Sequence, residues 1–308
     1  MAEAHARNGT FWREVIQASR PSFLLLTPLC VALGLGTAMT AQADWNPWRL
    51  VLVTLGALLA HAAVNLLNEA EDFRSGLDLQ TSRTSFSGGS GTLPAQPAAL
   101  GWVQVAAWVA LGLVVAIGLW LVIIAGPGLL LLGAMGLILV TGYSGWIVRS
   151  PLMCLMAPGL GIGLMVPGTH YAMTGTFDNV ALVATLVPAL LCSALLLVNQ
   201  IPDTDADRRV RRRHLPIVLG RERAAIVFAL LVMGAYVALM VSVGFGALPA
   251  GALAGLLPLP VAIWLVIRVR RHARDIPRLV PWLGVNVAVV LTTIGLMAAG
   301  LMGIPTAP

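Results

Sequence analysis

The sequence contains no lysine and little charge of any kind. Its 19 basic residues are all arginines, and charged residues fill only 10% of the 308 positions, against 58% for hydrophobic residues. Without lysine, the glycine-rich stretch near residue 88 is not a nucleotide-binding P-loop. A mean hydropathy of +0.88 excludes a soluble globular protein. The net charge of +6 comes with no soluble basic domain, so we expect no nucleic-acid partner.

Cysteine is also scarce. Cys30, Cys154 and Cys192 stand singly within apolar stretches, with no Cys-x-x-Cys pair and no histidine at the spacing of a metal ligand. This pattern predicts neither a disulfide framework nor a metal–thiolate site, and the three residues read as small packing residues.

Long apolar runs are what the sequence has in abundance. About nine runs of roughly 20 residues are long enough to span a membrane. They lie at 22–43, 49–68, 101–124, 126–147, 152–173, 180–200, 224–245, 248–267 and 280–303. We therefore expect an all-α polytopic membrane protein that forms a single domain over 1–308, with its first helix retained and not cleaved as a signal peptide.

The arginines are distributed asymmetrically along these runs. All but Arg49 precede the first run or follow an even-numbered one. The positive-inside rule then places the N-terminal segment 1–21 and the two long polar loops, 69–98 and 203–223, in the cytoplasm. The predicted location is a bacterial inner membrane, with the active site on the cytoplasmic side and the C-terminus outside.

Two acidic clusters stand at the ends of the second and sixth runs, and they hold more than half of the 13 acidic residues. Each contains Asn-x-x-x-Asp, which puts an amide and a carboxylate one helical turn apart on one face. Carboxylates at membrane depth are costly without a partner cation. The six side chains that we expect to bind metal are Asn68, Asp72, Asp78, Asn199, Asp203 and Asp207.

The predicted metal is Mg²⁺ on a diphosphate. Mg²⁺ prefers octahedral oxygen ligands, typically one or two carboxylates completed by substrate phosphate and water. Gly76 must turn the chain to bring Asp78 back, and Pro202 should loosen the end of the second helix. Asp205 points away from the face of Asp203. The alternative is a set of solvated interfacial carboxylates paired with nearby arginines.

Other residues near the clusters are candidates for binding the substrates. Arg83 and the run 208–213 can grip diphosphate oxygens, or can serve topology and anionic lipid heads. The glycine-rich loop 85–93 can cradle an anion with its amides or be a plain turn. Tyr143 and Tyr171 can shield a carbocation or simply pack.

The two acidic sets have a familiar spacing. Asn-x3-Asp followed by a third Asp six residues later, paired with Asn-x3-Asp-x3-Asp, resembles the two signatures of the UbiA superfamily of intramembrane prenyltransferases. The likeness runs from Ser-Arg-Pro at 19–21 to residues 213–220. Residues 73–78 and the glycines at 88–91 are most similar to the menaquinone-pathway branch, 1,4-dihydroxy-2-naphthoate prenyltransferase.

The resemblance implies nine helices around a central cavity, with both motifs at its cytoplasmic mouth and a side opening to the lipid bilayer. It implies transfer of a polyprenyl group from polyprenyl diphosphate to an aromatic acceptor, with Mg²⁺ as cofactor and Asp72 and Asp203 as catalytic carboxylates. Within this framework we assign diphosphate binding to Arg83, Arg212 and Arg213. We assign acceptor binding to Tyr143, Arg149 and Tyr171.

The sequence also departs from the family pattern. Residues 144–151 stand where a proline-rich, basic stretch is expected, and Cys154 or a close neighbour falls where a glutamate is expected. Glu69 and Glu71 stand where an aspartate and an aromatic residue are common. These departures leave the predicted diphosphate site intact and concern the acceptor.

Two other functions stay open. One keeps the fold and changes the acceptor to another quinone precursor, a tetrapyrrole or a glycerol lipid. The other is a transporter whose acidic clusters bind coupling ions. Transporter sites lie near the middle of the membrane on broken helices. The clusters of this chain lie at helix ends beside arginine-rich loops, which favours the enzyme.

Overall fold

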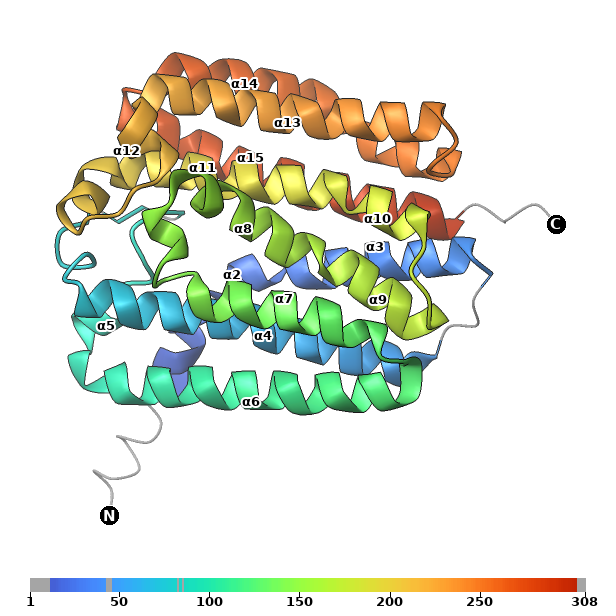
Figure 1. Cartoon of the computed structure of the whole chain (residues 1–308). Coiled ribbons are helices and arrows are strands. Elements are labelled where there is room, and N and C mark those ends of the chain that lie inside the picture. Colours follow the sequence, from blue (N-terminus) through green and yellow to red (C-terminus); the bar gives the residue numbers. More distant parts are fainter. Residues whose placement is uncertain (1–11, 43–45, 82, 85, 304–308) are drawn as a thin grey trace.

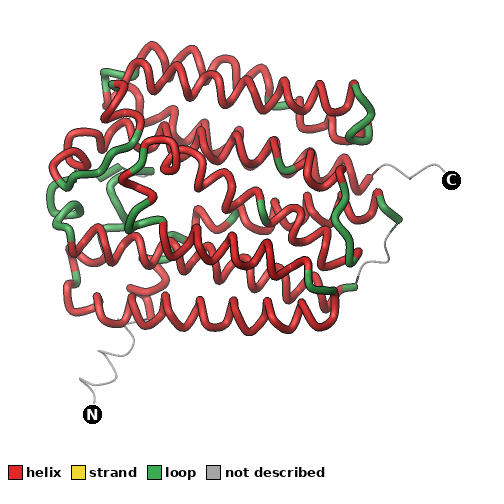
Figure 2. The backbone as a smooth tube through the Cα atoms, in the orientation of Figure 1, coloured by secondary structure: helices red, strands yellow, loops and turns green. Residues whose placement is uncertain are grey.

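A computed structural model describes residues 12–42, 46–81, 83–84 and 86–303. This part of the chain is helical and contains no strand, which confirms the predicted all-α class. The long helices lie side by side along a common direction (Figures 1 and 2). Helices suit so apolar a chain because each satisfies its backbone hydrogen bonds internally, without water.

The elements follow one another along the chain without a second domain-like layer. After a helical stretch at 12–18, they are α2 (Pro21–Leu24), α3 (Leu26–Thr40), α4 (Pro47–Arg74), α5 (Thr92–Ala95), η1 (Pro97–Ala99), α6 (Leu100–Ala125), α7 (Gly128–Gly142), η2 (Ile147–Arg149), α8 (Pro151–Gly163), α9 (Met165–Thr174), α10 (Asn179–Ala184), α11 (Leu186–Arg209), α12 (Leu215–Leu219), α13 (Arg221–Gly244), η3 (Ala250–Leu256), α14 (Leu259–His272) and α15 (Ile276–Gly303).

The predicted count of nine spans is close but is not confirmed. Within the described ranges, seven helices are long and apolar enough to cross a membrane, or eight if η3 and α14, bent by 40°, form one span. The run predicted at 126–147 shortens to α7, which has only 15 residues. The predicted N-terminal segment 1–21 lies outside the described residues up to residue 11.

Both acidic motifs lie at the same end of the bundle. Helices α4 and α11 end there, next to α12 and the loop after α4, at the left of Figure 1. The last described residue of α15 lies at the opposite end. Two separate hydrophobic cores hold the helices: the larger includes α11, α13, α14 and α15, and a smaller one joins α4 to α6.

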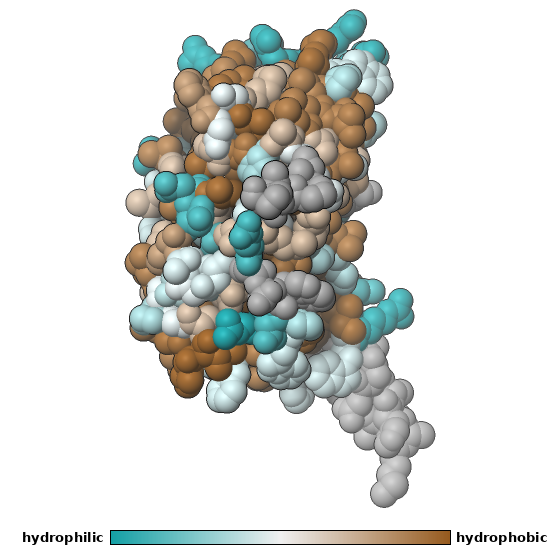
Figure 3. All heavy atoms as spheres, turned by 90° about the vertical axis from the view of Figure 1, so that its right-hand side faces the viewer, coloured by the Kyte–Doolittle hydropathy of each residue, from teal (hydrophilic) through white to brown (hydrophobic). Residues whose placement is uncertain are grey.

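Arg49, the one arginine outside the asymmetry, has a structural role at the opposite end. It donates hydrogen bonds to the carbonyl of Ile124 at 2.7 Å and to that of Ala172 at 3.3 Å, near the ends of α6 and α9. A cation at these carbonyls complements both helix dipoles. Figure 3 looks onto this end and shows scattered hydrophilic side chains among a largely hydrophobic surface.

Candidate active site

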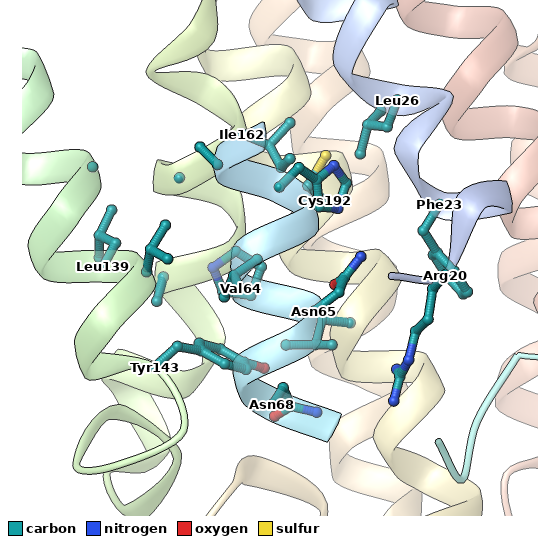
Figure 4. Close-up of a pocket in the computed structure, with 18 of the residues that line it drawn as sticks. Arg20, Phe23, Leu26, Val64, Asn65, Asn68, Leu139, Tyr143, Ile162 and Cys192 are labelled. Carbon is teal, nitrogen blue, oxygen red and sulfur yellow. The ribbon is translucent and has the colours of Figure 1, made fainter. Parts of the chain in front are cut away.

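A largely apolar cavity of about 440 Å³ lies between the helices, with the acidic motifs at one end of it. Its wall includes parts of α4, α6, α7, α8, α9, α11 and α15. Figure 4 shows side chains from several of these helices facing the cavity. The polar residues of the mouth are Arg20, Asn65, Asn68, Asp72, Asp78, Asn199, Gln200, Asp203, Asp207 and Arg212.

The first motif is organised by the end of α4. The helix extends to Arg74, so Asn68 and Asp72 stand on one continuous face, and Asn68 Nδ2 donates to Asp72 Oδ2 at 2.9 Å. Gly76 then turns the chain with φ of 73°, which confirms the predicted break. The backbone N–H of Asp78 donates to the carbonyl of Asp72 at 3.4 Å, and the Asp78 side chain is buried beside the motif.

The second motif lies on α11. This helix continues through Pro202 to its last turn, so the prediction that Pro202 loosens the helix end is wrong. Helix packing around the proline keeps Asn199, Asp203 and Asp207 on successive turns. Asp205 points elsewhere, as predicted: its side chain is 68% exposed and pairs with an arginine at the start of α13.

A glycine-rich loop, residues 86–91, connects the two motifs. The N–H of Gly88 donates to Asp203 Oδ2 at 3.0 Å. Gly89, with φ of 75°, packs on the first motif so closely that a Cβ there would come within 2.7 Å of Asp78 Oδ1. The loop therefore contributes a backbone donor to the site, and only glycine fits at these contacts.

Arg212 joins the motifs through its side chain. Its guanidinium contacts the carboxylate of Asp72 and donates to Asp207 Oδ1 at 3.1 Å, while His214 Nε2 lies 2.7 Å from Asp207 Oδ2. Burial disfavours the charge of Arg212, but the two carboxylates outweigh it and raise its pKa. The structure thus brings Arg212 into the mouth, as predicted.

The other predicted substrate residues are divided by the structure. Tyr143 lines the cavity and points from the end of α7 toward the face of α4 that carries Asn68 (Figure 4). Arg83, Arg149 and Arg213 are exposed and are not part of the cavity wall. Tyr171 lies at the far end of the bundle, where its hydroxyl accepts from the N–H of Gly128 at 3.1 Å.

Arg20 is a residue of the mouth to which sequence reasoning gave no role. It lines the cavity, has a left-handed backbone with φ of 54°, and forms an ion pair with Glu69 at 3.0 Å. Its position directly before Pro21 and the first apolar run was the available signal. Gln200 was also missed; its amide donates to Cys154 Sγ at 3.1 Å, at the position where the family pattern suggests a glutamate.

The mouth has the donors that an oxygen-loving divalent cation requires. Asp78 Oδ2, Asn199 Oδ1 and Asp203 Oδ1 are buried and have no hydrogen-bond partner. Burial, followed by the charges of Glu69 and Asp72, raises the pKa of Asp78 to about 7, and a cation nearby would reverse this shift. Among the described residues, no three His, Cys, Asp or Glu side chains form a metal cage by themselves. The site fits Mg²⁺ whose shell is completed by substrate and water.

Comparison with known families decides the identity of this fold and site. A model described as the UbiA prenyltransferase family matches residues 26–282. The chain belongs to the UbiA prenyltransferase family. This membership accounts for paired Asn/Asp motifs at the mouth of a membrane-embedded cavity. No curated protein matches this UbiA family member at the level of sequence.

Solved structures support the same fold for this UbiA family member. A UbiA homologue from Aeropyrum pernix has a TM-score of 0.67 at 17% identity, covering 92% of this chain and 98% of the homologue. A UbiA homologue from Archaeoglobus fulgidus, bound to GPP and Mg²⁺, has a TM-score of 0.60 at 14% identity, covering 94% and 100%. A digeranylgeranylglyceryl phosphate synthase has a TM-score of 0.65 at 14% identity, covering 96% and 100%.

Proposed function

We propose that this prenyltransferase moves a polyprenyl group from polyprenyl diphosphate to an aromatic acceptor, with Mg²⁺ as cofactor, and that the acceptor is 1,4-dihydroxy-2-naphthoate of menaquinone biosynthesis. The observation that carries the proposal is the set of unpartnered oxygens on Asp78, Asn199 and Asp203 at one end of an apolar cavity. The Archaeoglobus homologue bound to GPP and Mg²⁺ supports the donor and the metal.

Residues from both motifs would hold the metal and the diphosphate. Asn68, Asp72 and Asp78 face it from the end of α4, and Asn199 and Asp203 face it from α11. Mg²⁺ bound there would supply positive charge that stabilises the departing diphosphate as the allylic C–O bond breaks. The guanidinium groups at the mouth add donors for diphosphate oxygens.

The cavity walls protect the allylic cation that this bond cleavage forms. Most of the lining side chains are aliphatic, so they exclude water that would otherwise capture the cation. The ring of Tyr143 lies at the boundary between the apolar wall and the motifs. An electron-rich acceptor ring then forms the new C–C bond at the carbon that carries its carboxylate, and loss of CO₂ restores the aromatic ring.

The acceptor is tested with purified protein, one labelled prenyl diphosphate and a panel of acceptors. The panel contains 1,4-dihydroxy-2-naphthoate, 4-hydroxybenzoate and a glycerol phosphate lipid. We expect Mg²⁺-dependent release of diphosphate and labelled product with the naphthoate. Product with another acceptor alone would reject the naphthoate assignment. No diphosphate release with any of them would reject this prenyl transfer altogether.

The apolar part of the cavity should limit the length of the donor's tail. Gly118 on α6 and Gly136 on α7 line it, and a Cβ at either position would meet no atom within 4 Å. A leucine would project into this space, so Gly136→Leu should lower turnover of a long polyprenyl diphosphate about tenfold and spare geranyl diphosphate. Gly112→Leu is the control, because Gly112 is equally open but lies outside the cavity wall. Equal losses for short and long donors would contradict this role.

The mouth of the cavity should face the cytoplasm. We base this proposal on the arginines, which gather at the same end of the bundle as the motifs, in residues 208–223 and 268–278. A topology reporter inserted within 208–223 should read as cytoplasmic, and a reporter fused to the C-terminus as extracytoplasmic. The reverse pattern would place the site on the other side of the membrane.

A further inference from the structure

Glu69 lies next to Asn68 in the first motif but does not share its surroundings. Its side chain is fully buried, and its carboxylate accepts hydrogen bonds from three groups. The N–H of Ser90 donates to both carboxylate oxygens at 3.1 Å, the hydroxyl of Ser90 donates to Oε1, and Arg20 Nη2 donates to Oε2 at 3.0 Å. These bonds occupy both oxygens, so Glu69 is poorly suited to be a metal ligand.

The bond to Ser90 determines where the glycine-rich loop sits. Two residues before Ser90, Gly88 donates its N–H to Asp203, and between them Gly89 packs on Asp78. The loop is thus attached to α4 through Glu69 and to α11 through Asp203. Gly88 and Gly89 have φ of 83° and 75°, so the backbone takes a shape that few other residues allow.

The bond to Arg20 holds a second donor of the mouth. Arg20 has an unfavourable left-handed backbone, and its Nε is buried without a partner. The ion pair with Glu69 fixes one edge of the guanidinium and leaves Nε free on the residue that lines the cavity. One buried carboxylate therefore orients a backbone N–H and a guanidinium toward the same mouth.

We propose that Glu69 is a positioning residue that holds the glycine-rich loop and Arg20 at the diphosphate end of the cavity. The role of the loop in turnover rests on the proposed function, whereas the attachment of the loop does not. An aspartate at this position would be shorter by one C–C bond of about 1.5 Å, too short to reach Ser90. Glu69→Gln keeps the reach and an acceptor oxygen.

The first test is local proteolysis, which needs no substrate. The chain has no lysine, so trypsin cleaves it only after arginine, and Arg83 is exposed directly before the loop. Glu69→Ala should accelerate cleavage after Arg83 about tenfold or more, because the loop opens more often once its hydrogen bonds are lost. Cleavage after Arg274, an exposed site on α14's connection to α15, should not change.

Glu71→Ala is the matched control, since Glu71 lies on the same helix and makes no side-chain bond within the described residues. The second test is kinetic: Glu69→Ala should raise the Michaelis constant for the prenyl diphosphate about tenfold, and that for the acceptor much less. Glu69→Gln should restore both properties better than Glu69→Asp.

Three results would overturn the proposal. The first is equal cleavage after Arg83 in the Glu69→Ala and Glu71→Ala proteins. The second is acceleration at Arg274 by the same factor as at Arg83, because Glu69 would then stabilise the whole bundle. The third is loss of Mn²⁺ binding in Glu69→Gln with unchanged cleavage, which would make Glu69 a metal ligand. A protein with no prenyl transfer at all would reject the proposed function, and the cleavage rates would still decide the role of Glu69.

Discussion

Replacing Asp203 with alanine is expected to lower kcat about a thousandfold while the protein stays folded. Asp203 has a buried, unpartnered Oδ1, and its other oxygen accepts only from the glycine-rich loop. The carboxylate therefore stabilises no neighbouring helix, and its loss should be felt by the metal and the diphosphate. Asp72→Ala should cause a similar loss of turnover through the other motif.

The control for this prediction is Asp205→Ala. Asp205 lies on the same helix, but its side chain is 68% exposed and faces Arg221. The measurements are steady-state turnover, Mn²⁺ binding to the purified protein and elution as a single species in detergent. Losses of the same size at Asp203 and Asp205 would mean that the motif face on α11 has been assigned incorrectly.

Arg212→Ala is expected to cost about 3–5 kcal/mol of stability as well as activity. Arg212 is largely buried between the carboxylates of Asp72 and Asp207, which are themselves almost completely buried. Removing the guanidinium leaves two like charges in a poorly solvated site. Thermal unfolding of the detergent-solubilised variant should show a clearly lowered Tm, and Mg²⁺ with diphosphate should recover part of it because they replace the missing positive charge.

Arg213→Ala separates this effect from a general loss of cytoplasmic charge. The Arg213 side chain is exposed, and the bond that fixes this residue comes from its backbone N–H to the carbonyl of Val148 at 3.1 Å. Its removal should leave the Tm nearly unchanged. A large drop for Arg213→Ala, or none for Arg212→Ala, would show that the ion-pair network does not carry the stability of the mouth.

The fold class and the two motifs could be predicted because both depend on spacing along single helices. Apolar run length predicts membrane helices, and a spacing of four residues places Asn68 and Asp72 on one face whatever lies around them. The exposure of Asp205 followed from the same helical geometry. Pro202 was misjudged because packing of α11 against its neighbours outweighs the local weakness of a proline.

The partners of the motifs could not be predicted, because they come from other segments. Nothing in the run 208–213 distinguishes Arg212 from Arg213 until the turn after α11 points one inward and the other outward. Tyr171 looked like an acceptor residue, but the direction in which α9 crosses the bundle carries it to the far end. The attachment of Ser90 to Glu69 joins residues 21 positions apart through a loop of irregular shape.

The short helix α7 ties this protein to the thickness of its membrane. Its 15 residues rise about 22 Å, whereas a typical hydrocarbon layer is about 30 Å thick. Gly142 is its only buried residue, so lipid and cavity, more than protein, surround it. Acyl chains beside α7 must shorten or tilt to match it, and this hydrophobic mismatch thins the bilayer next to the tail cavity. The acyl-chain length of the host lipid thereby becomes a determinant of how readily a membrane-dissolved donor reaches the site.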